Sequence, residues 1–115
     1  MRRVRTILLY KNYFKEFYID LNEGARKKVN FVLRLIESQI VIPSKFLRTI
    51  EGVKGLYEIK IEYMGNIYRV FCYFDKGNIV VLFCGFQKKS NKTPKEQILR
   101  AKQILKEYIS ENGSE

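Results

Sequence analysis

Between residues 55 and 86 the side chains alternate with a period of two, and this pattern constrains the fold more than any other feature of the sequence. The first of three such stretches places four apolar or aromatic side chains on one face of a strand, namely Tyr57, Ile59, Ile61 and Tyr63. Short segments that contain Gly and Asn, at 64–66 and 75–78, separate the stretches, as is typical of β-hairpins. The sequence therefore predicts an antiparallel meander of three strands over 56–63, 67–74 and 79–86.

Two amphipathic helices are expected before this meander. Apolar residues recur at helical spacing at positions 14, 17, 18 and 21, and again at 29, 32, 33, 36 and 40. This spacing predicts a helical hairpin with Gly24 near the joint between the two helices. Pro43 ends the hairpin, and 44–50 is expected to form a turn or a short helical piece.

A further helix is expected after the meander. Thr93, Pro94 and Glu96 match the N-cap, the first helical position and the capping box of a helix start. Residues 3–10, at the other end of the chain, are rich in strand formers and predict a first strand. The expected fold class is α+β, with a twisted antiparallel sheet and the order β-α-α-β-β-β-α.

The length of 115 residues predicts a single domain. We expect this domain to cover 1–110, with 111–115 as a frayed tail. No apolar run is long enough to cross a membrane, and the basic N-terminus is not followed by the apolar stretch of a signal peptide. The expected location is the cytoplasm, where Cys72 and Cys84 would remain free thiols in the core.

The net charge of the chain is +10, from 22 Lys and Arg residues against 12 acidic residues. Such a charge indicates a polyanionic partner, with nucleic acid the first candidate. The sequence contains no His, which removes the commonest metal ligand and the usual general base at neutral pH. We therefore expect no metal and no cofactor, so that any catalysis has to use Lys, Arg, Tyr or carboxylate groups.

Charged residues fall at alternate positions within the predicted meander. A two-residue turn at 65–66 places Glu62 opposite Arg69. In the same register Lys60 lies opposite Phe71. One face of the sheet then carries a group of charged side chains with an aromatic ring beside them, namely Glu58, Lys60, Glu62, Arg69 and Tyr73. This group is compatible with a functional site and equally with a solvated cross-strand ion pair.

A second basic feature follows the last strand of the meander. Residues 85–95 contain four lysines and no acidic residue, namely Lys88, Lys89, Lys92 and Lys95. These side chains and the free amides of a helix start are groups that bind phosphate. Phe86 and Tyr73 offer aromatic faces for an unstacked base. The segment is either a solvated loop or a site, and its direct continuation from the Arg69 face favours the site.

Cleavage of RNA is chemically feasible with these residue types. RNA supplies its own nucleophile, the 2′-hydroxyl, so an enzyme has to align the attack, stabilise negative charge and move protons. Arg and Lys side chains stabilise the charge. A Lys or Tyr whose pKa is lowered by neighbouring cations can exchange the protons, and grouping the basic residues of the two features would lower lysine pKa values in this way.

Three ordered motifs resemble the phage-derived branch of the RelE/HigB toxin superfamily. They are GLYEIK at 55–60, YRVF at 68–71, and GFQKK at 85–89 followed by KTP at 92–94. The resemblance extends over nearly the whole chain, including 45–52. It implies a small RelE/ParE-like fold and the toxin of a type II toxin–antitoxin pair. Such a toxin is a metal-independent endonuclease that cuts mRNA on the ribosome and is held inactive by a cognate antitoxin, here expected to be of the helix-turn-helix type.

The resemblance also implies residue roles. By motif position it assigns catalysis to Lys60, Arg69 and Lys89, with Lys88 next to the last of them. The sequence departs from the family pattern at three points. Glu58 stands where relatives have another lysine, Tyr108 is the one tyrosine after Lys92, and the His residues of HigB relatives are absent.

Two other functions are compatible with the same sequence. ParE-like relatives share the fold and poison DNA gyrase without cutting RNA. A catalytically inactive relative would bind RNA with a steep salt dependence and leave growth unaffected. Transcript cleavage separates both alternatives from the endoribonuclease.

Overall fold

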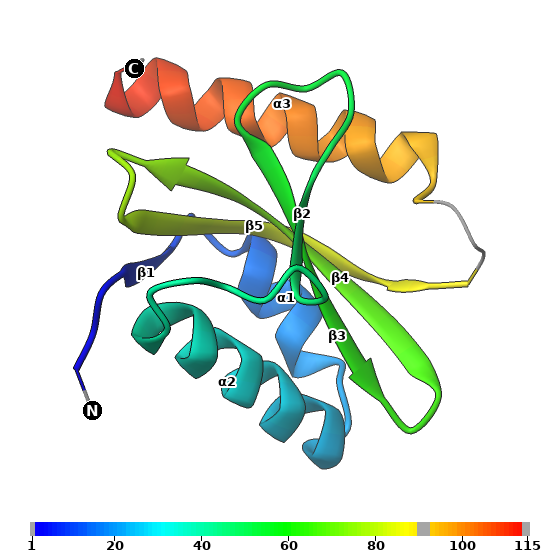
Figure 1. Ribbon diagram of the computed structural model, residues 1–115. Coiled ribbons are helices and arrows are strands. Elements are labelled where there is room, and N and C mark those ends of the chain that lie inside the picture. The colour runs from blue at the N-terminus through cyan, green and yellow to red at the C-terminus, as the bar shows by residue number, and fades with distance from the viewer. Residues whose placement is uncertain (1, 90–92, 114–115) are drawn as a thin grey trace.

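The computed structural model describes residues 2–89 and 93–113, which form a five-stranded sheet with helices on both faces (Figure 1). Helices α1 (Tyr13–Ile19) and α2 (Glu23–Ser38) cover one face, and α3 (Lys95–Asn112) covers the other. The strands lie in the order β1-β5-β4-β3-β2. Their bounds are Thr6–Leu9 for β1, Leu47–Thr49 for β2, Leu56–Tyr63 for β3, Asn66–Asp75 for β4 and Ile79–Lys88 for β5.

The predicted α+β class, helical hairpin and meander are confirmed, and two features of the sheet differ from the prediction. Strand β1 pairs with β5 in parallel, from Thr6 opposite Ile79 to Leu9 opposite Leu82, so the sheet is mixed rather than purely antiparallel. The segment 44–50, expected to be a turn or a helical piece, contains β2, which pairs antiparallel with β3. Three residues are too few to show a period of two, so the sequence carries little signal for this strand.

The hairpin between β3 and β4 turns at Met64 and Gly65. Both residues have positive φ, 51° and 79°, as a two-residue type I′ turn requires. Tyr63 therefore lies opposite Asn66. The turn is one residue earlier in the chain than predicted, which moves the pairing of the two strands by two positions.

This register brings the two basic residues of the hairpin together, because Lys60 lies directly opposite Arg69. The predicted pairs Glu62–Arg69 and Lys60–Phe71 are therefore wrong. The shift is an even number of residues, and side chains on a strand alternate between faces, so every side chain stays on its predicted face.

The core between the sheet and the helical hairpin is apolar. The spacing of the predicted α2 stripe is confirmed for Val29, Val32 and Ile36, which are fully buried, but Ile40 is 78% exposed. The helix ends at Ser38, before Ile40, because Gln39 adopts an extended backbone conformation with φ −87° and ψ 128°. The remaining buried members of this core are Phe14, Leu21, Ala25, Ile59, Ile61, Tyr68, Val70, Cys72, Val80 and Leu82.

A second core lies between the sheet and α3. A β-bulge in β5 places two consecutive residues, Phe83 and Cys84, opposite the single β4 position 71, and both are buried in this core. Cys84 and Cys72 are free thiols, as predicted. The other buried members are Tyr10, Ile50, Leu56, Phe71, Tyr73, Val81, Ala101, Ile104, Leu105 and Tyr108.

Helix α3 begins and ends later than predicted. Its N-cap is Pro94, with no side-chain hydrogen bond at the cap, so Thr93 is not the N-cap residue. The helix continues to Asn112, and residues 111 and 112 are therefore helical rather than frayed, whereas 114 and 115 lie outside the described residues. Within the described part of the chain, no helix has the length and apolar character that a membrane span requires.

Candidate functional site

The charged residues of the β3–β4 hairpin lie on the sheet face that α3 partly covers. Glu58 is fully buried and Arg69 is 4% exposed, although both carry charges. Charged side chains are almost never this buried unless they are paired. The solvated cross-strand pair that the sequence allowed is therefore not what the structure contains at this position.

Glu58 is the centre of a network of three partners, of which two donate hydrogen bonds to it and the third forms an ion pair with it. Its Oε1 accepts from Nε of Arg48 at 2.8 Å, and Nη1 of Arg69 lies 3.2 Å from the same oxygen. Its Oε2 accepts from the hydroxyl of Thr93 at 2.8 Å. Nη2 of Arg48 donates to that hydroxyl at 3.2 Å, which closes the network. One buried carboxylate thus joins β2, β3, β4 and the residue that precedes the N-cap of α3.

Arg69 is the more deeply buried of the two arginines in this network. Its Nε is buried without a hydrogen-bond partner among the described residues. Burial lowers the pKa of the guanidinium, and the neighbouring Glu58 carboxylate opposes this effect. An arginine stays charged in either case, so Arg69 presents a fixed positive charge that its protein surroundings satisfy incompletely.

A cleft of about 160 Å³ opens beside the network. Lys60 and Arg69 line it from the hairpin, and Arg48 lines it from β2. The main-chain amide of Lys60 donates to the carbonyl of Phe46 at 2.9 Å, which joins the cleft to the segment before β2. The other lining residues are Ser44, Lys45, Leu47 and Glu58. Four cationic side chains therefore face one buried carboxylate, and the cleft has the charge and donors for an anion such as a phosphodiester.

Lys88, rather than Lys89, belongs to this face. Lys88 lies opposite Ile67 at the end of β5, two residues after Phe86, which lies opposite Arg69. Burial and the charges of Arg69, Arg48 and Lys60 lower the pKa of Lys88. Lys89 follows the strand and is exposed.

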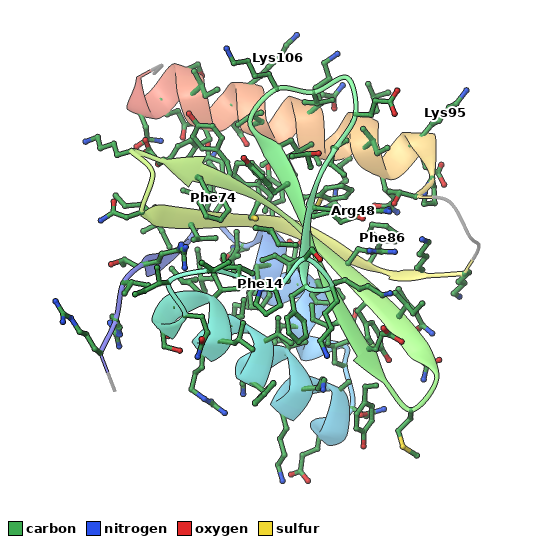
Figure 2. All side chains as sticks on the ribbon, in the orientation of Figure 1. Phe14, Arg48, Phe74, Phe86, Lys95 and Lys106 are labelled. Atoms are coloured by element: carbon green, nitrogen blue, oxygen red, sulfur yellow. The ribbon has the colours of Figure 1, made fainter. Side chains whose placement is uncertain are left out.

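The two predicted aromatic surfaces lie in different environments. Phe86 is partly exposed and stacks on Phe71, with ring centroids 5.7 Å apart and an interplanar angle of 25°. In Figure 2 Phe86 and Arg48 are drawn on the side of the molecule where α3 begins. Tyr73 lies in the core beneath α3 and is 8% exposed, so its ring does not offer a surface for a base. Tyr73 lies on the sheet face on which it was predicted, but α3 covers that end of the face.

The remaining predicted residues lie around the start of α3. Lys95 is its first residue and is exposed. Lys92 lies outside the described residues. Tyr108, the one tyrosine after Lys92, is buried, and its hydroxyl donates to Asp75 at 2.6 Å. It therefore serves the core beneath α3 and not the cleft.

Besides Lys45, which also lines the cleft, sequence reasoning missed Arg48. It belongs to the site because β2 pairs with β3 and places Arg48 opposite Glu58. The signal that could have found it is Glu58 itself, since a carboxylate on a buried strand requires a cationic partner on a neighbouring strand. In the part of the chain that the structure describes, His, Cys, Asp and Glu side chains form no group of three suited to a metal ion.

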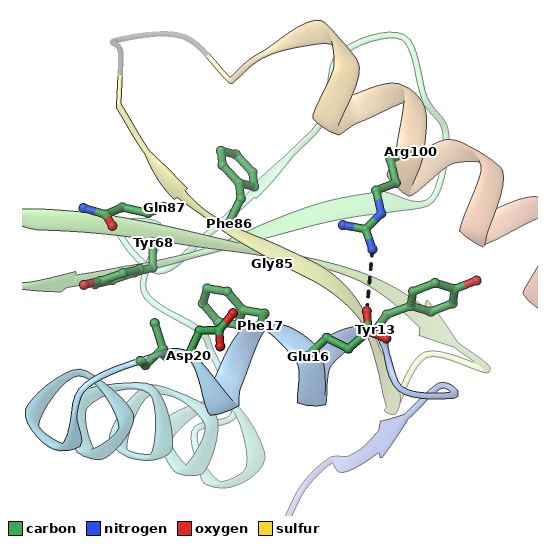
Figure 3. Close-up of a pocket in the computed structure, with 10 residues that line it drawn as sticks. Tyr13, Glu16, Phe17, Asp20, Tyr68, Gly85, Phe86, Gln87 and Arg100 are labelled. Carbon is green, nitrogen blue, oxygen red and sulfur yellow. Dashed lines mark ion pairs between the residues drawn. The ribbon is translucent and has the colours of Figure 1, made fainter.

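A larger cavity of about 340 Å³ lies at the edge of β5, between α1 and α3 (Figure 3). Phe17, Tyr68 and Phe86 form part of its wall, and Arg100 pairs with Glu16 across it at 4.0 Å. A Cβ atom on Gly85 would lie 2.7 Å from the ring of Phe17. Gly85 thus allows α1 to pack directly on β5.

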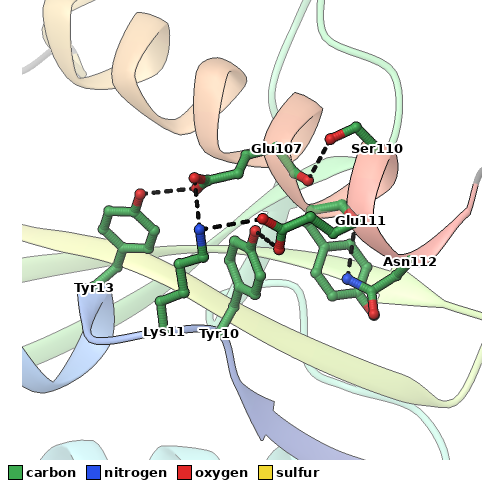
Figure 4. Close-up of polar contacts among 8 residues, drawn as sticks. Tyr10, Lys11, Tyr13, Glu107, Ser110, Glu111 and Asn112 are labelled. Carbon is green, nitrogen blue, oxygen red and sulfur yellow. Dashed lines mark hydrogen bonds and ion pairs between the residues drawn. The ribbon is translucent and has the colours of Figure 1, made fainter.

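The opposite end of α3 is held by a separate polar cluster (Figure 4). Lys11 donates to Glu107 at 2.7 Å and lies 3.3 Å from Glu111. The hydroxyls of Tyr10 and Tyr13 donate to Glu111 and Glu107 at 2.6 and 2.9 Å. Every member has a partner inside the cluster, which identifies it as a structural contact between α3 and the β1–α1 connection.

The fold and the cleft define a small α+β protein with a basic face organised around a buried carboxylate. The family model described as phage derived protein Gp49-like (DUF891) matches residues 16–106, and the chain belongs to this family of RelE/HigB-like toxins. The matched segment contains α2, β2 to β5 and most of α1 and α3, so the cleft lies within it. Membership of a toxin–antitoxin family implies an antitoxin partner. A search of curated proteins found no match.

Proposed function

We propose that this protein is the toxin of a type II toxin–antitoxin pair and cleaves mRNA on the ribosome without a metal ion. The observation that carries the proposal is the pairing of Lys60 with Arg69 beside a cleft that gathers further cations. A phosphodiester is the anion of nucleic acid that such a cleft fits, and Phe86 beside it supplies a surface for a base.

The proposed reaction uses the nucleophile of the RNA itself. The 2′-oxygen attacks the adjacent phosphorus and loses its proton, while the bond to the 5′-oxygen breaks and that oxygen gains a proton. The products are a 2′,3′-cyclic phosphate and a 5′-hydroxyl. Arg69 and Lys60 stabilise the negative charge that develops on the phosphoryl oxygens.

Lys88 is our candidate for proton transfer, together with Lys60. It lies on the same face as Arg69, and its lowered pKa increases the fraction that is neutral and able to accept a proton at moderate pH. We therefore assign to Lys88 the catalytic role that was predicted for Lys89. Lys89, Lys92 and Lys95 are proposed to contact the RNA backbone.

The antitoxin is proposed to be a helix-turn-helix or acidic protein that covers the basic face. The charge of +10 favours an acidic surface on this partner. Action on translated mRNA would place the protein in the cytoplasm.

Inducible expression in a bacterial host tests the proposal, with growth followed and the 5′ ends of transcripts mapped. Lys60→Met and Lys88→Met are the informative variants, because both side chains are partly exposed and their loss should leave the fold intact. Arg69→Ala is less informative, since it removes a buried charge from the Glu58 network. Lys106→Met, on the exposed face of α3, is the matched control.

The expected result is growth arrest with new cuts inside translated reading frames, lost in the two site variants and kept in the control. Arrest without cuts would favour gyrase poisoning. Absence of arrest would favour the inactive RNA-binding relative.

A further inference from the structure

We infer that Arg48 and Arg69 bind one phosphodiester of the RNA between them, and that Glu58 positions the two guanidinium groups for this contact. The inference deepens the proposed function, on which it rests. It assigns a phosphate-binding residue to β2, a strand to which neither the sequence nor the family motifs gave a role.

The guanidinium groups of Arg48 and Arg69 share one carboxylate oxygen of Glu58. Nε of Arg48 and Nη1 of Arg69 lie 2.8 and 3.2 Å from the same Oε1 of Glu58, so the two guanidinium groups are close neighbours. Two like charges repel each other, and an anion between them offsets this repulsion by attracting both. Glu58 supplies part of that charge, and a phosphate in the adjacent cleft would supply the rest.

The charged side chains of the network differ in their exposure to solvent. The Arg48 side chain is 52% exposed, whereas Glu58 is fully buried and the Arg69 side chain is 5% exposed. Arg48 thus extends from the buried network to the surface, with its Nε on Glu58 and its Nη2 on Thr93. These two contacts fix the plane of the guanidinium, and a fixed plane is what bidentate recognition of phosphate requires.

The residues that line the cleft carry more positive than negative charge. Arg48, Arg69, Lys45 and Lys60 line it with Glu58 as the one carboxylate among its lining residues. Both oxygens of Glu58 are engaged by the network, so the carboxylate serves to orient its partners and is not placed to take a proton from substrate. Glu58 is therefore a positioning residue in this inference.

Binding of a non-cleavable RNA tests the role of Arg48 separately from catalysis. The probe is a fluorescent oligonucleotide with 2′-O-methyl groups, which lacks the nucleophile, and the readout is anisotropy across a salt series. Arg48→Gln should weaken binding about tenfold, the effect of one hydrogen bond to a charged group, and should lower the salt slope by about one. Arg34→Gln, an exposed arginine on α2, is the matched control and should bind like the wild type.

Equal binding by the Arg48 and Arg34 variants would overturn the inference while leaving the proposed function intact. Failure of the wild-type protein to bind the probe would overturn the inference, whereas the proposed function is tested by transcript cleavage in the expression host. Urea midpoints of all three proteins are compared first, so that a loss of binding is not mistaken for a loss of fold.

Glu58→Gln tests the positioning role through opposite changes in binding and cleavage. The variant removes a negative charge from beside the phosphate and keeps the shape of the side chain. Affinity for the non-cleavable probe should rise, whereas the single-turnover rate on a cleavable RNA should fall because the guanidinium groups are held less firmly. Affinity and rate that fall together, in step with a lower urea midpoint, would show that Glu58 has a structural role alone and would overturn this part.

Discussion

The hydroxyl of Thr93 donates a 2.8 Å hydrogen bond to Oε2 of Glu58, across 35 positions of the chain. Through this bond the residue before the N-cap of α3 is attached to the middle of the sheet. The connection between β5 and α3 carries Lys89 and Lys92, two of the residues proposed to contact RNA, so the same bond also sets where that connection ends. Thr93 therefore links the stability of the fold to the placement of residues that are proposed to contact RNA.

Replacing Thr93 by Val should lower the free energy of unfolding by about 1 kcal/mol, because Oε2 of the buried Glu58 loses its donor. Thr93→Ser keeps the hydroxyl and should stay within a few tenths of a kcal/mol of the wild type. The measurement is urea unfolding followed by circular dichroism. Equal midpoints for the Val and Ser variants would show that the hydroxyl does not stabilise the fold.

Gly85→Ala should destabilise the protein by about 1–3 kcal/mol, because the added Cβ would lie 2.7 Å from the ring of Phe17 and overpack the α1–β5 contact. Phe17→Leu removes the ring from that space. The double variant should then be more stable than the sum of the two single changes predicts. Additive effects in this double-mutant cycle, measured in urea, would contradict the direct contact.

Glu107→Gln should make the free energy of unfolding less dependent on pH in the acid range. The hydrogen bonds from Lys11 and Tyr13 lower the pKa of the Glu107 carboxyl below its ordinary value of about 4.3. Its stabilising effect is therefore present above that value and is lost as the pH falls through the folded-state pKa. The variant should be less stable than the wild type at neutral pH, and the difference should close in acid.

Urea midpoints measured from neutral pH into the acid range check this expectation. Glu51→Gln, on an exposed turn, is the control and should follow the wild type throughout. A difference between the Glu107 variant and the wild type that persists unchanged into acid would mean that ionisation of the carboxyl is not its cause.

The sheet face on which each side chain lies could be predicted from the sequence, because successive side chains of a strand point to opposite faces. The error in the β3–β4 register was two residues, and an even error leaves Lys60 and Arg69 on the face assigned to them. What alternation cannot show is what covers a face. Tyr73 was expected to be available to a base, and α3 buries it, because the path of a helix across a sheet is decided by tertiary packing.

The parts of the site that were not predicted depend on short or local features. Arg48 lies on a strand of three residues, too short to leave a pattern. The Thr93-Pro94 pair has the composition of a helix start, but the cap falls at Pro94 and the hydroxyl of Thr93 bonds to Glu58 instead. To decide whether Lys88 or Lys89 lies on the basic face, the residue at which β5 ends has to be known. The ends of helices and strands are the least certain part of a sequence-based assignment.

Lys88 and Lys89 are adjacent in the sequence and should differ in their effect on cleavage. Lys88→Met should reduce the single-turnover rate on ribosome-bound mRNA by about 100-fold, the range of a general acid or base. Lys89→Met should leave the rate within a few fold, because this side chain is exposed beyond the end of the strand. Equal losses in the two variants would indicate a shared electrostatic role and contradict proton transfer by Lys88.

The pH profile of the same reaction distinguishes these roles further. The charges of Arg69, Arg48 and Lys60 add to burial in lowering the pKa of Lys88. If the neutral amine accepts the proton, the rate rises with pH through that pKa, below the range of an ordinary lysine. Arg48→Gln removes one of these charges, so the pKa of Lys88 rises and the rising part of the pH–rate profile moves to higher pH. If the rise in rate stays at the same pH in Arg48→Gln, or persists in Lys88→Met, the titrating group is another residue.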